Sequence, residues 1–273
     1  MTGRIETDAC TLTYKVEGHG EPAVFIQGVG LHGDGWLPQI GVLKSQFSCI
    51  TFDNRGIGQS QPAGAEISVS RLAADTLSIM DAAGIETAHL VGHSLGGAVA
   101  LEIALMAPQR ARSLALLCTS ACGADGTRLT AKMIWLGIRT RIGTRRMRSN
   151  AFLEIVLPRE YLAAQNKDAL AERLQPLFGH GLGDTPSIAM LQLKALRNFD
   201  AGGRLKEFRG IPTLVVSAEY DIIFPPACGI ALAACINGAK YVEIPGAAHG
   251  VTIQCDETVN RLLHEHFDSA RAL

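Results

Sequence analysis

Short apolar runs alternate with longer amphipathic stretches along most of this chain. Residues 12–16 alternate apolar and polar side chains, as in a strand with one buried face, and residues 23–26 form a continuous apolar run. A continuous run is typical of a strand that is covered on both faces. Further strands are predicted at residues 49–52, 88–91, 113–117, 213–217 and 240–244.

Helices are predicted between these strands. Ser68 or Ser70 can cap a helix that ends at Gly84, and Pro108 stops a helix that begins near Gly97. Two more helices are expected, near residues 226–235 and 256–269. The repeated order of strand and helix predicts an α/β fold with a mainly parallel sheet and helices on both faces.

The alternation stops between residues 123 and 205. This stretch is helical in rhythm and contains no convincing strand. We therefore predict an α/β core formed by residues 1–122 and 206–273, with a helical cap inserted at residues 123–205.

One motif carries candidate chemistry. Gly92-His93-Ser94-Leu95-Gly96-Gly97 fits the pattern Gly-x-Ser-x-Gly and lies between a predicted buried strand and a predicted helix. A serine there sits on a sharp strand-to-helix turn, and the flanking glycines keep so tight a bend free of side chains. This context predicts that Ser94 is a nucleophile.

A nucleophilic serine needs a base to take its proton and a carboxylate to orient that base. Such groups belong on loops at the carboxyl ends of parallel strands. Asp221 and His249 follow the predicted strands at 213–217 and 240–244, so they are the expected acid and base. Glu219 and Asp125 are alternative acids.

These residues carry a resemblance to a known family. The elbow, the Asp221 loop, the Ala-His249-Gly loop and the turn Asp53-Asn54-Arg55-Gly56 resemble those of the α/β-hydrolase superfamily, over nearly the whole chain. Within it, the chain is similar to small esterases and lactonases related to 3-oxoadipate enol-lactonase. The resemblance implies hydrolysis of a small ester or lactone through an acyl-enzyme, without a metal or organic cofactor.

The resemblance also implies an oxyanion hole and a substrate pocket. The backbone N–H groups of Leu95 and Val29 are the expected oxyanion donors, although the chain has Gln27-Gly28 where the family usually has His-Gly. The pocket candidates are Gly28, Trp36, Met133, Trp135, Phe224 and Val251.

Composition restricts the setting. The chain has 273 residues, 47% hydrophobic and 19% charged, and its net charge of −1 gives no pull toward nucleic acid. No stretch approaches the ~20 apolar residues of a membrane span. Seven cysteines without a Cys-x-x-Cys pair favour free thiols in a reducing compartment, so a cytoplasmic location is expected. The protein is expected to be a monomer or homodimer and to hold no metal. The spacing of Cys118 and Cys122 is only a weak metal signal.

Three other interpretations stay open. Gly28-Val29-Gly30-Leu31-His32-Gly33 with Asp53 matches a dinucleotide fingerprint, but Asp34-Gly35-Trp36-Leu37-Pro38 interrupts the helix that phosphate binding requires. The same triad could hydrolyse a carbon–carbon bond. It could also belong to a ligand-sensing protein with little turnover.

The predicted cap contains a basic stretch without acidic residues. A solvated helix face explains it most simply, and attraction of an anionic substrate is the sharper hypothesis. Its members are Arg128, Lys132, Arg139, Arg141, Arg145, Arg146 and Arg148.

Overall fold

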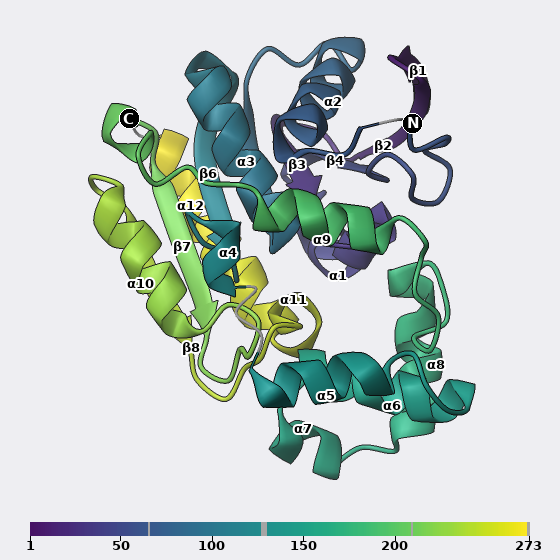
Figure 1. The fold of residues 1–273 in the computed structure, drawn as a ribbon. Coiled ribbons are helices and arrows are strands. Elements are labelled where there is room, and N and C mark those ends of the chain that lie inside the picture. The colour runs from purple at the N-terminus through teal and green to yellow at the C-terminus, as the bar shows by residue number, and fades with distance from the viewer. Residues whose placement is uncertain (65, 127–129, 209, 272–273) are drawn as a thin grey trace.

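The computed structural model describes residues 1–64, 66–126, 130–208 and 210–271, and Figure 1 shows how their elements are arranged. Eight strands form one sheet in the order β1-β2-β4-β3-β5-β6-β7-β8. Their bounds are β1 Thr2–Thr7, β2 Cys10–Glu17, β3 Glu21–Ile26, β4 Phe47–Phe52, β5 Ala88–His93, β6 Ala111–Leu117, β7 Thr213–Ala218 and β8 Lys240–Ile244.

The sheet is antiparallel at one edge and parallel elsewhere. β1 pairs with β2 and β2 with β4 in antiparallel fashion, and each pairing from β4 through β3, β5, β6 and β7 to β8 is parallel. The carboxyl ends of the parallel strands therefore meet at one edge. The α/β fold predicted from the sequence is confirmed, and β1 is an added edge strand, exposed or half-buried along its length, that the hydrophobic pattern did not reveal.

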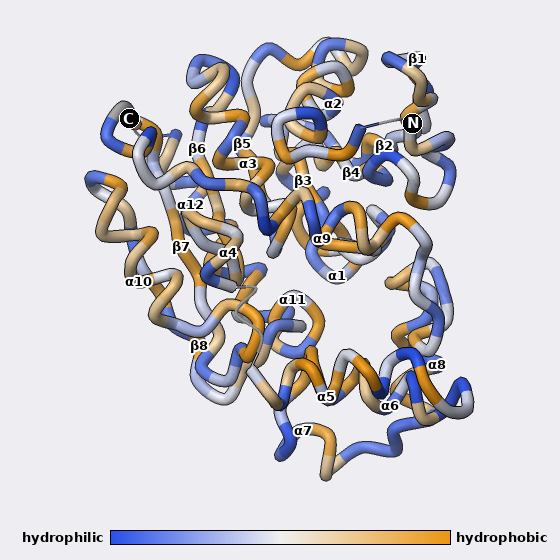
Figure 2. Tube along the Cα trace, in the orientation of Figure 1, coloured by the Kyte–Doolittle hydropathy of each residue, from blue (hydrophilic) through white to orange (hydrophobic). Residues whose placement is uncertain are grey.

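Alternating side chains of the strands enter separate cores on the two faces. Val24 and Ile26 of β3 lie in one apolar cluster, whereas Ala23 and Phe25 lie in the other. The first cluster is covered by α2 (Val69–Ala82), α3 (Leu95–Met106) and α10 (Pro226–Cys235), and the second by α1 (Leu37–Leu43), α11 (Val251–Gln254) and α12 (Asp256–Arg271). Apolar residues accordingly follow the central strands in Figure 2.

Between β6 and β7 the chain is helical, as its rhythm predicts. The helices are α4 Gly123–Gly126, α5 Ala131–Arg139, α6 Arg145–Val156, α7 Arg159–Ala163, α8 Lys167–Phe178 and α9 Ala189–Arg197. Leu153, Leu170, Leu174 and Phe178 belong to a small apolar core of α6 and α8. In Figure 1 the helices α5–α8 form a group away from the sheet, and α9 lies between them and α3. The division at residues 123 and 205 stays a prediction.

None of the described helices is both long and apolar enough to cross a membrane.

Candidate active site

Ser94 is the single residue that connects β5 to α3. Its backbone has φ of 56° and ψ of −118°, a left-handed conformation that is unusual for a residue with a side chain. The Ser94 N–H donates to the Leu117 carbonyl at 2.9 Å, and Thr119 Oγ1 donates to the Ser94 carbonyl at 2.9 Å. These bonds to the end of β6 hold the turn in place.

The glycines of the motif have a steric reason. A Cβ on Gly92 would collide with the Gly96 carbonyl, and a Cβ on Gly96 would collide with the Ile26 carbonyl. The helix can therefore begin directly after Ser94 and pack closely on β3. Glycine is therefore required at positions 92 and 96 because the backbone segments of the turn approach each other too closely for a side chain.

Asp221 and His249 are brought together from two neighbouring strand ends. His249 Nδ1 lies 2.8 Å from Asp221 Oδ2, and both side chains are buried. The other carboxylate oxygen of Asp221 accepts the N–H groups of Ile223 at 2.8 Å and Phe224 at 3.0 Å. These bonds fix the carboxylate, which orients the imidazole.

The two alternative acids lie elsewhere. Glu219 accepts the Gly246 N–H at 2.8 Å, so its carboxylate holds the loop after β8, and Asp125 is exposed on α4. Of the three candidates, the structure pairs only Asp221 with His249 in the described part of the chain.

His93 holds the backbone of His249 in place through a hydrogen bond. Burial lowers the pKa of His93 to about 3, so its imidazole is neutral, and its Nε2–H donates to the His249 carbonyl at 2.8 Å. Cys118 is also close, since ligand atoms of His93, Cys118 and His249 all lie within 4.8 Å of one another. Burial raises the pKa of the Cys118 thiol, and His249 Nδ1 is engaged by Asp221, so this set does not suit a metal ion.

Ser94 and His249 open into one cavity of about 200 Å³. Its described lining contains no lysine, arginine, aspartate or glutamate. The apolar walls come from four elements outside the sheet and from the loops at its edge: Leu31, Phe152, Ile155, Val156, Leu177, Phe178, Leu193, Leu196, Ile223 and Ile253. A wider, more polar cleft of about 860 Å³ reaches Asp221 but touches neither Ser94 nor His249.

Of the six predicted pocket residues, Gly28 lines this cavity. Trp36 instead packs in the core against Phe25, with ring centroids 5.4 Å apart, and Val251 lies in the same core. Phe224 is behind His249, its ring stacked on the imidazole at 6.2 Å. Trp36, Val251 and Phe224 are all fully buried, because the segments after the strand ends fold these side chains into the cores.

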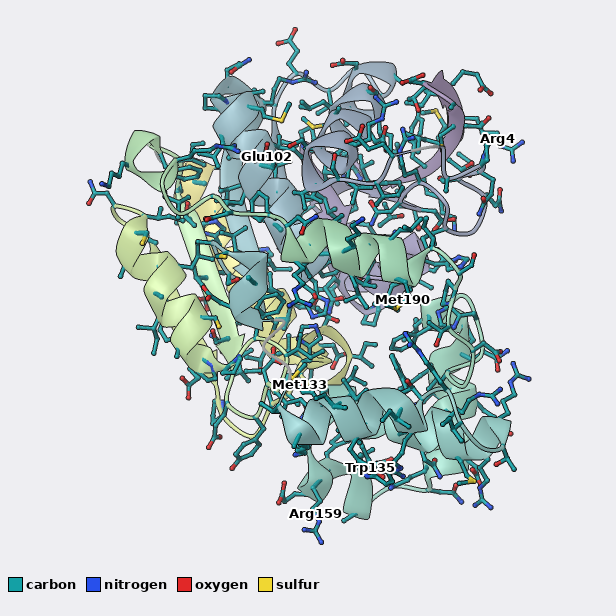
Figure 3. The ribbon with its side chains drawn as sticks, in the orientation of Figure 1. Arg4, Glu102, Met133, Trp135, Arg159 and Met190 are labelled. Atoms are coloured by element: carbon teal, nitrogen blue, oxygen red, sulfur yellow. The ribbon has the colours of Figure 1, made fainter. Side chains whose placement is uncertain are left out.

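Met133 and Trp135 are also absent from the described lining of the cavity. Figure 3 labels them on opposite sides of α5, and 60% of Trp135 is exposed. The walls on this side are built by α6, α8 and α9 instead. Helical rhythm alone did not indicate which helix of the insertion faces the site.

The predicted oxyanion donors flank Ser94. Leu95 is the first residue of α3, where N–H groups have no partner within the helix, and Val29 lines the cavity. The loop of Val29 is held by side chains on both sides. Gln27 Oε1 accepts the Gly28 N–H at 3.0 Å, and Gln192 Oε1 accepts the Gly30 N–H at 2.8 Å.

Two of these supports were not predicted from the sequence. Gln192 of α9 and His180, whose Nε2–H donates to the Gly30 carbonyl at 3.1 Å, lie 162 and 150 residues from Gly30. No local pattern marks residues so distant along the chain.

The dinucleotide interpretation finds no support in the geometry. Gly33 begins a four-residue 3₁₀ turn, Gly33–Trp36, instead of lying in a long helix aimed at phosphate. Asp53 is engaged by the same loops, since its Oδ1 accepts the Gly33 N–H at 2.9 Å and its Oδ2 accepts the Gln59 N–H at 3.1 Å. These glycines and Asp53 shape the loop beside Ser94.

Of the six described cations of the basic stretch between β6 and β7, four are paired with carboxylates. Arg139 contacts Glu154 at 2.7 Å, Arg145 contacts Asp184 at 2.7 Å, and Arg146 contacts Asp168 at 2.6 Å. None of the described cations of the stretch lines the cavity, and Arg128 lies outside the described residues.

A mostly parallel sheet with a serine on the turn between a central strand and the following helix is the architecture of α/β hydrolases. A family model described as alpha/beta hydrolase fold matches residues 21–254, and the chain therefore belongs to this family.

Relatives of the chain are named as hydrolases. It is 29% identical over 252 residues to "Putative carbamate hydrolase RutD" of Azorhizobium caulinodans, covering 92% of this chain and 93% of that protein. A hydrolase from Pseudomonas aeruginosa PA01 superimposes with a TM-score of 0.79 at 25% identity, over 97% and 98% of the two chains. The enol-lactonase from Burkholderia xenovorans LB400 gives 0.81 at 22% identity, over 97% and 100%, which shows a common fold.

Proposed function

We propose that this protein is a serine hydrolase that cleaves small, uncharged carboxylic esters or lactones through an acyl-enzyme. The observation that carries the proposal is that His249, paired with Asp221, lines the same apolar cavity as Ser94. Its volume of about 200 Å³ is below the usual range for drug-sized ligands, which favours a small substrate.

The proposed reaction has two halves. In the first, His249 Nε2 takes the Ser94 proton while Ser94 Oγ attacks the carbonyl carbon, and Asp221 holds the Nδ1–H tautomer. The N–H groups of Leu95 and Val29 stabilise the negative oxygen of the tetrahedral intermediate. His249 then gives its proton to the departing alkoxide, and the acyl group remains on Ser94.

In the second half, water replaces the alcohol. His249 removes a proton from water as the water oxygen attacks the acyl-enzyme carbonyl. The intermediate collapses, Ser94 Oγ leaves with the proton from His249, and the carboxylic acid departs. In a lactone the alcohol stays attached to the product acid, and the bonds formed and broken are otherwise the same.

The lining favours uncharged substrates over anionic ones. A carboxylate or carbamate anion in this cavity would lose its hydration without gaining a cation, because the described walls are apolar. The name of the carbamate hydrolase relative makes a carbamate a useful competitor in the test. We expect an alkyl ester to be cleaved at least ~10-fold more efficiently than an anionic carbamate.

The test compares wild type with Ser94→Ala on p-nitrophenyl esters of increasing acyl length, simple lactones and a carbamate. We expect kcat to fall by roughly 10⁴-fold or more in the variant, since the nucleophile is lost. Ser149→Ala removes a serine of similar burial that does not line the cavity, so it should retain activity. Hydrolysis that persists in folded Ser94→Ala would contradict the mechanism.

A further inference from the structure

The apolar stripe of α5 faces outward. Ile134 and Ile138 of α5, together with Ile142 just after the helix, recur at four-residue spacing, and they are 46%, 44% and 66% exposed. Trp135 lies beside this row, whereas Leu136, on the opposite side of the helix, is buried. A helix that packs in a globular protein normally turns its stripe inward, so this arrangement is the reverse of the usual one.

The exposed stripe continues onto neighbouring elements. Met147, in the first turn of α6, is 56% exposed, and Met190 of α9 is 49% exposed. Arg141 Nη2 lies 2.7 Å from Met190 Sδ, which joins the turn after α5 to α9. Figure 2 shows hydrophobic residues along α5, and Figure 3 labels Trp135 on the outer side of α5. Contiguous exposed apolar surface of this kind marks an interaction site.

The stripe is surrounded by positive charge. Residues 131–148 contain six cations and no aspartate or glutamate. Ion pairs bring three carboxylates of other segments, Glu154, Asp168 and Asp184, onto these cations, which leaves the cations in excess. Lys132 lies on the other side of α5, where it lines the wider cleft with Leu136 and Glu154. We call the outward surface the α5 face: Ile134, Trp135, Ile138, Arg139, Arg141, Ile142, Arg145, Arg146 and Arg148.

The charge decides between possible occupants. A second copy of the chain related by two-fold symmetry would place the same cationic surface against itself, which is repulsive. An anionic lipid surface supplies both an apolar layer for the stripe and negative headgroups for the cations. The net charge of the whole chain is only −1, so the excess on the α5 face is local.

We propose that the α5 face docks on anionic lipid bilayers, with Trp135 and the isoleucines entering the interfacial layer and the arginines contacting headgroups. This binding does not depend on the proposed reaction at Ser94. It requires no spanning helix, because an amphipathic helix lies in the plane of the interface.

Trp135 provides the experiment, because the chain has two tryptophans and Trp36 is fully buried. Purified protein is titrated with vesicles of phosphatidylcholine containing 30% phosphatidylglycerol, and with phosphatidylcholine alone. We expect a blue shift of tryptophan emission and co-sedimentation with the anionic vesicles, both reduced by added salt. The double variant Trp135→Ser/Ile138→Ser should bind the anionic vesicles at least roughly 10-fold more weakly than wild type.

A matched control replaces an exposed apolar residue far from α5. Val42→Ser, at a position 53% exposed on α1, should bind vesicles as wild type does. Melting curves and activity on a water-soluble ester keep folding and catalysis separate from lipid binding, because Trp135 and Ile138 do not line the cavity.

Three results would overturn the proposal: no binding to anionic vesicles, equal binding to neutral vesicles, or binding that the double variant retains. A fourth is a stable dimer in sedimentation analysis that Trp135→Ser/Ile138→Ser dissociates, since the α5 face would then contact a second copy. Loss of ester hydrolysis in Ser94→Ala leaves this test unaffected.

Discussion

The backbone of Ser94 is held where few non-glycine residues are found. A left-handed backbone of this kind costs about 1–3 kcal/mol, and surrounding bonds must maintain it. Leu117 at the end of β6 and Thr119 just after it supply those bonds, and the close approach of Gly92 to the Gly96 carbonyl leaves no room for a side chain at position 92. The fold thereby presents the side chain of Ser94 to the cavity.

At this scale, Asp221→Asn tests the orienting role of the carboxylate. The substitution keeps the shape but removes the charge that stabilises a protonated His249, so we expect kcat to fall by about 10³–10⁴-fold near pH 7. Steady-state kinetics across pH measures this loss. Glu219→Gln is the control, because Glu219 contacts Gly246 and not His249, and its rate should stay within about threefold of wild type. A larger loss in Glu219→Gln than in Asp221→Asn would reverse the assignment of the acid.

At the scale of elements, α9 serves the site in two ways. Leu193 and Leu196 form part of the cavity wall, and Gln192, directly before Leu193, accepts the N–H of Gly30 in the loop that contains Val29. The helix α9 therefore forms part of the cavity wall and also binds Gly30, the residue next to Val29, a predicted oxyanion donor.

Gln192→Leu removes the acceptor of the Gly30 N–H. A buried N–H without a partner costs about 1–3 kcal/mol, so we expect the loop to shift and kcat to fall by roughly 10-fold with a smaller change in KM. Lys194→Ala, an exposed substitution on the same helix, should leave both constants unchanged. Gln192→Glu retains an acceptor and should recover part of kcat. A change confined to KM would mean that the loop only binds substrate.

Leu193→Phe tests the wall itself. A larger ring narrows a cavity of about 200 Å³, so we expect kcat/KM for hexanoyl or longer esters to fall at least ~5-fold while acetate is spared. Leu191→Phe adds the same ring to an exposed position of α9 and should leave the chain-length profile unaltered. If the dependence of kcat/KM on acyl length changed equally in both variants, the acyl group would not bind against Leu193.

The core elements and the contact between Asp221 and His249 could be predicted because they follow from local order. Asp221 lies in the loop after β7 and His249 in the loop after β8, and parallel strand ends meet at one edge. The cavity walls could not be predicted in the same way. Trp36 and Trp135 are both aromatic residues near predicted loops or helices, yet one is in the core and the other is exposed. Tertiary packing alone decides between these outcomes.

At the scale of the whole molecule, three histidines are buried in their neutral form. Burial lowers the pKa of His89 to about 4, of His93 to about 3 and of His266 to about 4. In the unfolded chain each returns to about 6.5. Below that pH the unfolded state binds protons that the folded state does not, so the stability present above pH 6.5 is lost as the pH falls toward 4.

We therefore expect the free energy of unfolding to decrease between pH 6.5 and 4.5, by up to ~1.4 kcal/mol per pH unit for each histidine. Urea unfolding at pH 7.5, 6.0 and 5.0 measures the slope. His266→Gln should flatten the slope by about a third, whereas His19→Gln, at an exposed position, should not change it. Stability that is constant across this range would show that these imidazoles are protonated in the folded protein.

The bonds from Gln192 and His180 to Gly30 have a practical consequence for chimeric enzymes. Substrate range could be altered by grafting the segment between β6 and β7 from one relative onto the sheet of another. Grafting a foreign segment onto the sheet of this protein would change the cavity walls, but it would also remove both hydrogen bonds to Gly30. The grafted segment and the loop that contains Gly30 should therefore be chosen, or redesigned, so that their residues can form these hydrogen bonds with each other.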